Sequence, residues 1–289
     1  MNFALVYGTI GAFALAVFCW RLWLTLRAPR RPELWAVAVA ILLSAVGFEA
    51  AVPRIYTAIG DAAGVPNLAT LVVYGAIAGS VLAQLVWTTF MVSPGDVPLS
   101  TAVAGSARRT LQVGAAALTV MTALFALAPV HDRTHATDFD YHYSTTVLVD
   151  LFLAVYLAVY TVALAWIIRL CRVWLPQVRG AGQAWLRRGL RLLGIGSVIA
   201  LGYSAGKVIA VVGAWFGADF YDLNVSVAPA FASLGASVML VGYLFPSFVP
   251  RIAAAGNRIR ATRRLRPLWR ALRDIAPELA APARRRPGH

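Results

Sequence analysis

Residues 145–170 read TTVLVDLFLAVYLAVYTVALAWIIRL, with only two charged side chains among them, Asp150 and Arg169. A helix needs about 20 apolar residues to cross the hydrocarbon core of a bilayer. Inside lipid, a single segment can satisfy all of its backbone hydrogen bonds only as a helix. This stretch therefore predicts a membrane-spanning helix and indicates the fold class.

Six further stretches have a similar length and apolar character, at about 3–26, 34–52, 67–91, 109–130, 190–216 and 225–248. The composition agrees, because 60% of the 289 residues are hydrophobic and only 13% are charged. Soluble domains usually carry about 25% charged residues. The sequence therefore predicts an all-α, polytopic integral membrane protein, a seven-transmembrane-helix bundle over residues 1–250.

Arginine is strongly biased toward alternate gaps between these segments. The net charge is +14, and 23 arginines lie at or in the first, third and fifth gaps and in the C-terminal tail. The opposite gaps hold only Arg54 and Arg133. Basic loops stay in the cytoplasm, so we predict an N-out/C-in orientation. The partner that this charge indicates is the anionic inner leaflet of the lipid bilayer, with no nucleic acid expected.

The tail, residues 251–289, is too polar to enter the membrane and is expected to be cytoplasmic. A short amphipathic helix is predicted at about 267–280, because Leu268, Leu272, Ile275 and Leu279 fall on one of its faces. Arginines surround that face, so the helix would lie on anionic lipid or dock on a cytoplasmic protein partner. The predicted docking residues are Pro267, Leu268, Trp269 and Leu272.

Lys207 is the only lysine, and it lies well inside the segment 190–216. At about ten residues from the end, its depth is about 15 Å, too far for the side chain to reach water by snorkelling. An ammonium group there needs an acidic partner or a wet cavity. We predict a polar cluster in the outer half of the bundle, made of Lys207, Asp150, Glu49, Tyr203 and Tyr74. It would be a pocket for a small polar ligand or a proton, or equally a structural ion pair.

The segment HDRTHATDFDYH, residues 131–142, contains three of the four histidines. Imidazole and carboxylate groups are ligands for Zn²⁺. A metal site on the outer surface is therefore one interpretation, although the spacing matches no specific motif and a solvated acidic loop is favoured. Its candidate ligands are His131, His135, His142, Asp138 and Asp140.

A stripe of small residues marks the sixth segment at Gly202, Gly206, Gly213 and Gly217. These offsets return to nearly the same side of a helix. The stripe predicts a close-packing face for a neighbouring helix, with packing inside one chain favoured over dimerisation. The oligomeric state is left open.

The sequence contains no HExxH, P-loop or CxxC motif, so we do not expect an enzyme. No cofactor is predicted either. A retinal-binding lysine would belong on the seventh helix, whereas Lys207 falls on the sixth.

Several short motifs occur in a characteristic order. They are GVPNLA at 64–69, Asp138-Phe139 before the fifth span, Tyr203 and Lys207 on the sixth, and LRPLWRAL at 265–272 followed by Pro277-Glu278. In this order the chain resembles a family of actinobacterial seven-span membrane proteins of unestablished function, whose usual label is transporter. The resemblance implies a bacterial plasma membrane, and a longer cytoplasmic domain that is shortened here.

The leading functional hypothesis from the sequence is a non-enzymatic membrane sensor or regulatory protein, with a signal received in the outer half. The alternatives are a small-molecule or ion transporter and a structural subunit of a membrane complex. Transport requires a polar path through the inner half, where the sequence offers little beyond Gln84 and Thr88.

Overall fold

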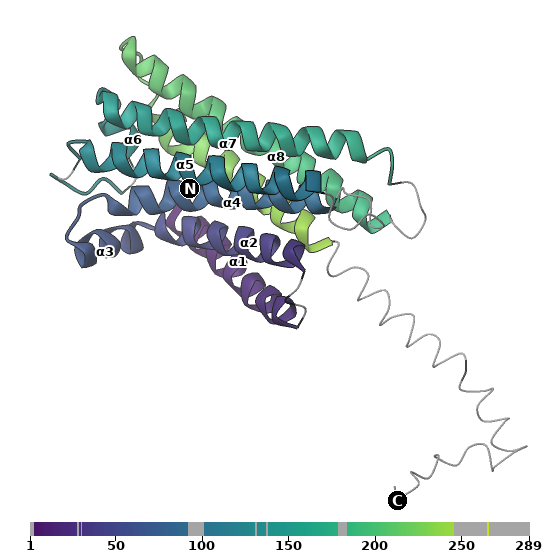
Figure 1. Ribbon diagram of the computed structural model, residues 1–289. Helices are drawn as coiled ribbons and strands as arrows, with labels where there is room; N and C mark the ends of the chain where they lie inside the picture. The colour runs from purple at the N-terminus through teal and green to yellow at the C-terminus, as the bar shows by residue number, and fades with distance from the viewer. Residues whose placement is uncertain are drawn as a thin grey trace, which may run out of the picture.

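The computed structural model describes residues 3–27, 29, 31–91, 101–130, 132–136, 138–178, 184–245 and 265. Most of these residues are helical and none of them forms a strand, and seven of the helices are long and apolar enough to cross a membrane (Figure 1). The all-α, seven-helix prediction is confirmed. The helices are α1 (Phe3–Leu26), α2 (Pro32–Ala50), α4 (Leu68–Met91), α5 (Thr101–Leu127), α7 (Val147–Trp174), α8 (Ala184–Trp215) and a last helix, Leu223–Phe245, which begins with the π-helical segment η2 (Leu223–Val227).

Two helices begin earlier than the hydropathy pattern indicates. α5 starts at Thr101 instead of 109, and α8 starts at Ala184 instead of 190. The added turns carry polar and basic residues such as Arg108 and Arg187. Hydropathy marks the part of a helix that matches the hydrocarbon core, whereas backbone hydrogen bonding continues into the polar interface.

Two short helices, α3 (Pro53–Ala63) and α6 (Phe139–His142), lie at one end of the bundle, which we call the α6 end (Figure 1). Pro53 is well placed as a first helical residue, because its missing N–H would lack an intrahelical partner anyway. α3 stops at Gly64, whose φ of 65° allows the Val65 N–H to close back on the Gly60 carbonyl. These short helices bring polar side chains over the ends of the long ones.

α4 is central to the packing, with α2, α5 and α7 against it, α1 on the far side of α2, and α8 against α7. The largest fully buried side chains include Tyr156 and Phe152 of α7 and Met121 of α5. α5 is otherwise exposed along much of its length, as are many apolar side chains elsewhere, including Phe13 and Val162. Such surfaces suit contact with lipid tails.

The last helix packs closely on α8. Of the glycine stripe, Gly202 and Gly206 face the last helix, where added Cβ atoms would lie 2.6 Å from the Phe231 ring and 2.9 Å from the Ala228 Cβ. Gly213 instead faces Phe220 in the following connection, and Gly217 lies beyond α8 with a φ of 74°. The stripe thus divides between a helix contact and a turn.

Candidate functional site

Lys207 of α8 forms an ion pair with Asp140 of α6. Both side chains are buried, with 8% and 5% of their surfaces exposed. Tyr74 of α4 donates its hydroxyl hydrogen to the same carboxylate. A buried charge needs a paired and hydrogen-bonded partner, and Asp140 supplies that partner for Lys207.

The predicted cluster is therefore only partly brought together. Lys207, Tyr203 and Tyr74 surround one cavity, but the two proposed acids lie elsewhere. Asp150 accepts a hydrogen bond from the Trp215 indole at 3.1 Å. The Glu49 carboxylate packs beside α1, 2.6 Å from where a Cβ on Gly11 would lie. We chose these acids by comparing the depths of residues on the predicted spanning helices. Asp140 lies between two spans, so the comparison of depths did not include it.

A cavity of about 420 Å³ runs from the α6 end into the bundle. Among the described residues, all the spanning helices except α5 contribute to its lining. His135 lines it near the α6 end, and Gln84 and Met239 line its deep part. Thr70 and Gln84 both line it, and at a rise of about 1.5 Å per residue they are about 21 Å apart along α4. The ion pair therefore stands in the wall of a deep cavity.

Tyrosine dominates the cavity wall. The six that line it are Tyr7, Tyr56, Tyr74, Tyr156, Tyr160 and Tyr203. The Tyr74 and Tyr156 ring centroids are 4.5 Å apart, and those of Tyr160 and Tyr203 are 5.6 Å apart. The Lys207 ammonium lies 5.8 Å from the centre of the Tyr203 ring. Such a wall is apolar over the ring faces, yet it offers hydroxyl groups to a bound molecule.

A second polar group lies deeper in the cavity, around Ser44, Ser80 and Gln84. The two serine hydroxyls are 2.6 Å apart, and the Gln84 Nε2 donates to Ser80 at 3.1 Å. Within the described part of the chain, the Gln84 Oε1 is buried without a hydrogen-bond partner, as is the Asn224 Oδ1. Asn224 belongs to η2, and π-helical turns are frequent at functional sites. Buried acceptors of this kind are expected to receive a hydrogen bond from water or a ligand.

Asn67 holds the loop that leads to α6. It is fully buried with a φ of 59°, a conformation that asparagine tolerates better than most residues. Its Nδ2 donates to the carbonyls of Val130 and Arg133, at 2.8 and 2.6 Å. Its Oδ1 accepts from the His135 N–H at 2.7 Å and from the Tyr56 hydroxyl at 3.1 Å. Sequence reasoning noted the Pro-Asn-Leu segment only as a family resemblance and missed this role.

Two tyrosine–aspartate hydrogen bonds tie the surface loops of the α6 end. Tyr143 donates to Asp132 at 2.5 Å, and this bond is the main reason that the pKa of Asp132 is lowered. Burial, reinforced by Asp132, raises the pKa of Tyr143 to about 12. Tyr141 donates to Asp219 at 2.9 Å, a bond that raises the pKa of Tyr141. Each tyrosine stays protonated and each aspartate ionised at neutral pH, so both bonds persist there.

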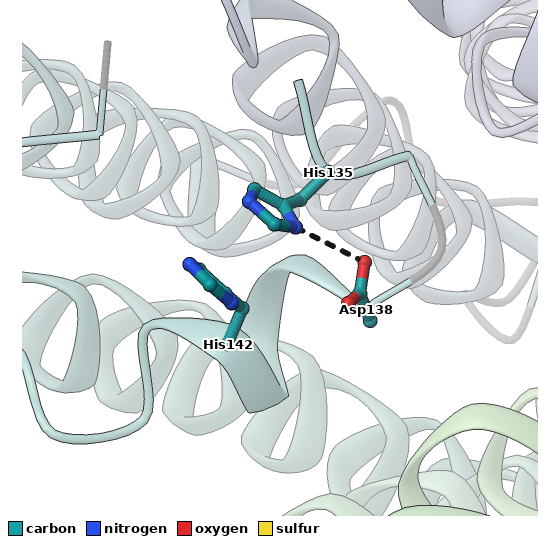
Figure 2. Close-up of side chains that lie close together, drawn as sticks. All are labelled: His135, Asp138 and His142. Carbon is teal, nitrogen blue, oxygen red and sulfur yellow. Dashed lines mark hydrogen bonds and ion pairs between the residues drawn. The ribbon is translucent and has the colours of Figure 1, made fainter. Parts of the chain in front are cut away.

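Three of the predicted metal ligands come together at the rim of the cavity. His135, Asp138 and His142 each place a donor atom within 4.8 Å of the others (Figure 2). Asp140 is not in this group, because its side chain points to Lys207 and Tyr74. His131 lies outside the described residues, as do the predicted docking residues Pro267, Leu268, Trp269 and Leu272.

The sequence matches no protein-family model, and no curated protein or solved structure matches it. The resemblance drawn from short motifs stays a prediction. Functional inference for this chain therefore rests on the geometry of the cavity and its rim.

Proposed function

We propose that this chain is a non-enzymatic membrane receptor that binds a small ligand in the cavity at the α6 end. The observation that carries the proposal is the 420 Å³ cavity with a buried ion pair in its wall. Pockets for small molecules are typically 300–1,000 Å³, largely apolar, with a few polar groups in fixed positions. The cavity has this size and this mixture of groups.

Ligand binding could be coupled to a conformational change through the ion pair. A carboxylate on the ligand would compete for Lys207, and an amine would compete for Asp140. A ligand that carries both groups would keep each buried charge compensated, whereas a ligand with only one would leave either Lys207 or Asp140 unpaired, which is strongly unfavourable. Since the pair connects α6 to α8, a ligand that replaced either partner would release one helix from the other. Binding would then alter the position of α8, whose arginine-rich beginning lies at the opposite end of the bundle.

A receptor is closed on its far side, and the packing beyond Gln84 supports this. One turn further along α4, the Trp87 ring meets the Tyr243 ring edge to face, with centroids 4.9 Å apart. Both side chains are buried, at 4% and 3% exposure, and Thr88 beside them is fully buried. In the proposed receptor, this aromatic pair would be the barrier between the cavity and the opposite end.

A transporter is the second candidate, and one observation favours it. A smaller void of about 20 Å³ lies below the cavity, and Gln84 lines both spaces. The void reaches Tyr243, whose hydroxyl is buried without a hydrogen-bond partner among the described residues. Rotation of the Trp87 or Tyr243 ring would extend a polar path toward the opposite end.

Cysteine accessibility separates the two candidates. In a chain with Cys19 and Cys171 replaced by serine and alanine, Ser44→Cys places a thiol in the cavity wall. A charged, impermeant methanethiosulfonate should modify it from the α6 side of sealed vesicles only. Modification from both sides would favour transport, and none from either side would contradict a water-filled binding cavity. Thr88→Cys, beyond the aromatic pair, is the matched control and should stay unmodified from both sides.

A further inference from the structure

We infer that His135, Asp138 and His142 form a binding site for a divalent transition-metal ion, with Zn²⁺ as the best fit, at the rim of the cavity. The site brings together two imidazoles and one carboxylate from a single loop and the short helix that follows it. Nitrogen and carboxylate donors are the set that Zn²⁺ accepts in sites with three protein ligands and one open position. Figure 2 shows the three side chains close together, with the His135 and His142 rings side by side and His135 joined to Asp138.

The distances are close to those that a metal needs. Ligand atoms about 2.1 Å from a tetrahedral Zn²⁺ lie about 3.4 Å from one another. Here the three donor atoms lie within 4.8 Å, and the His135 Nδ1 and Asp138 Oδ1 are already 3.4 Å apart. His142 is exposed and the other two side chains are partly exposed, so small rotations can close the remaining distance.

The backbone under the three ligands is held in place. The His135 N–H is fixed by the Asn67 side chain at 2.7 Å. The Asp138 carbonyl accepts from the N–H groups of Tyr141 and His142, at 3.0 and 2.8 Å, so these residues form one helical turn. Because only side chains have to move, little conformational entropy is lost on metal binding.

The protein satisfies this group of donors only in part, because the His135 Nδ1 contacts the Asp138 carboxylate while its other ring nitrogen has no partner among the described residues. The His135 Nε2 is buried and has no hydrogen-bond partner among the described residues. The two imidazole rings are stacked with centroids 3.8 Å apart, so both histidines lie together at this point of the rim.

Zn²⁺ at this position would also fix α6. Asp140 lies between Asp138 and His142 on the same turn, with its side chain turned toward Lys207. A metal bridging Asp138 and His142 would hold the turn that presents the Asp140 carboxylate to the cavity. The metal site itself does not depend on the receptor proposal, since its ligands lie outside the ion pair.

Zinc titration of the full-length, tag-free protein in detergent tests the site. Calorimetry should show about one Zn²⁺ per chain, and Co²⁺ should give a visible absorption band that Zn²⁺ removes. His135→Ala, His142→Ala and Asp138→Asn should each weaken Zn²⁺ binding by at least about tenfold. His142→Cys should retain binding, because a thiolate is also a zinc ligand.

Two control variants should bind Zn²⁺ like the unaltered protein. Asp61→Asn removes an exposed carboxylate from α3 at the same end of the bundle, and His289→Ala removes an imidazole distant in sequence. The Co²⁺ spectrum is measured on the unaltered protein, so this part of the test does not depend on whether the variants fold. An unaltered protein that binds neither ion, or equal Zn²⁺ binding in the three ligand variants and the controls, would overturn the site.

Discussion

At the residue scale, Lys207 and Asp140 place opposite charges inside the bundle, where both side chains are almost completely buried. Tyr74 adds a hydrogen bond to the carboxylate, so the charge on Asp140 has two partners. Such a pair contributes little net stability over apolar residues, but the loss of one member leaves a buried charge uncompensated. Stability should therefore depend on whether the two residues change singly or together.

Lys207→Met and Asp140→Asn should each lower the free energy of unfolding by about 3–5 kcal/mol. The double variant should recover much of this loss, because it leaves neither charge behind. Thermal unfolding in detergent, followed by tryptophan fluorescence, measures all three, with the exposed Asp61→Asn as control. Single variants as stable as the unaltered protein would show that the buried ion pair does not form.

Asn67 is the second residue whose replacement should lower the free energy of unfolding strongly. Asn67→Ala removes four hydrogen bonds and places alanine at a φ of 59°. Buried groups left unsatisfied are costly, so the free energy of unfolding should fall by about 2–4 kcal/mol. Asn67→Gly keeps the backbone freedom without the hydrogen bonds. It should lose nearly as much, and an Asn67→Gly variant of normal stability would assign the role of Asn67 to backbone conformation alone.

The sequence shows that Lys207 requires a partner, but it does not show which residue that partner is. The depth of Lys207 in an apolar helix requires a counter-charge, and this follows from the sequence alone. The identity of that acid does not, because Asp140 reaches Lys207 only after the loop beyond α5 folds back over the helix ends. Asn67 likewise acts through contacts with residues more than 60 positions away, at Val130 and Arg133.

At the element scale, the closest approach between the backbones of α8 and the last helix lies outside the predicted glycine stripe. A Cβ added to Gly235 would lie 2.8 Å from the Ala200 backbone nitrogen, and one on Gly196 would lie 2.8 Å from that of Met239. Spacing along one helix indicates a small-residue face. The crossing point of two helices decides which glycine meets backbone and which meets a movable side chain such as Phe231.

Gly235→Ala should therefore destabilise the protein, because the neighbouring backbone cannot move aside without separating the two helices. Overpacking of this kind lowers the free energy of unfolding by about 1–3 kcal/mol. Gly105→Ala is the matched control, since an added Cβ on that α5 glycine has nothing within 4 Å. It should be neutral or stabilise by up to about 1 kcal/mol through helix propensity. Equal effects of the two changes on thermal unfolding would contradict the close contact.

At the scale of the whole molecule, the two ends of the bundle differ in chemistry. The α6 end has the cavity rim, the histidine group and exposed acids such as Asp61 and Asp132. The opposite end has the arginines at the beginnings of α5 and α8. Hydropathy was enough to predict seven spans. A pocket around Lys207 was one of two interpretations of the sequence, but its size and lining could not be predicted, because they depend on where side chains of six packed helices fail to fill the space between them.

The arginine distribution predicts that the α6 end faces away from the cytoplasm. In a chain with Cys19 and Cys171 replaced, Asp61→Cys places an exposed thiol on α3, and Arg188→Cys places one near the beginning of α8. An impermeant maleimide added to intact cells should label the first and leave the second unlabelled until the membrane is permeabilised. The ligand of the proposed receptor and the Zn²⁺ of the rim site would then both arrive from outside the cell. The reverse labelling would place both sites in contact with the cytoplasm and would remove the charge argument for the orientation.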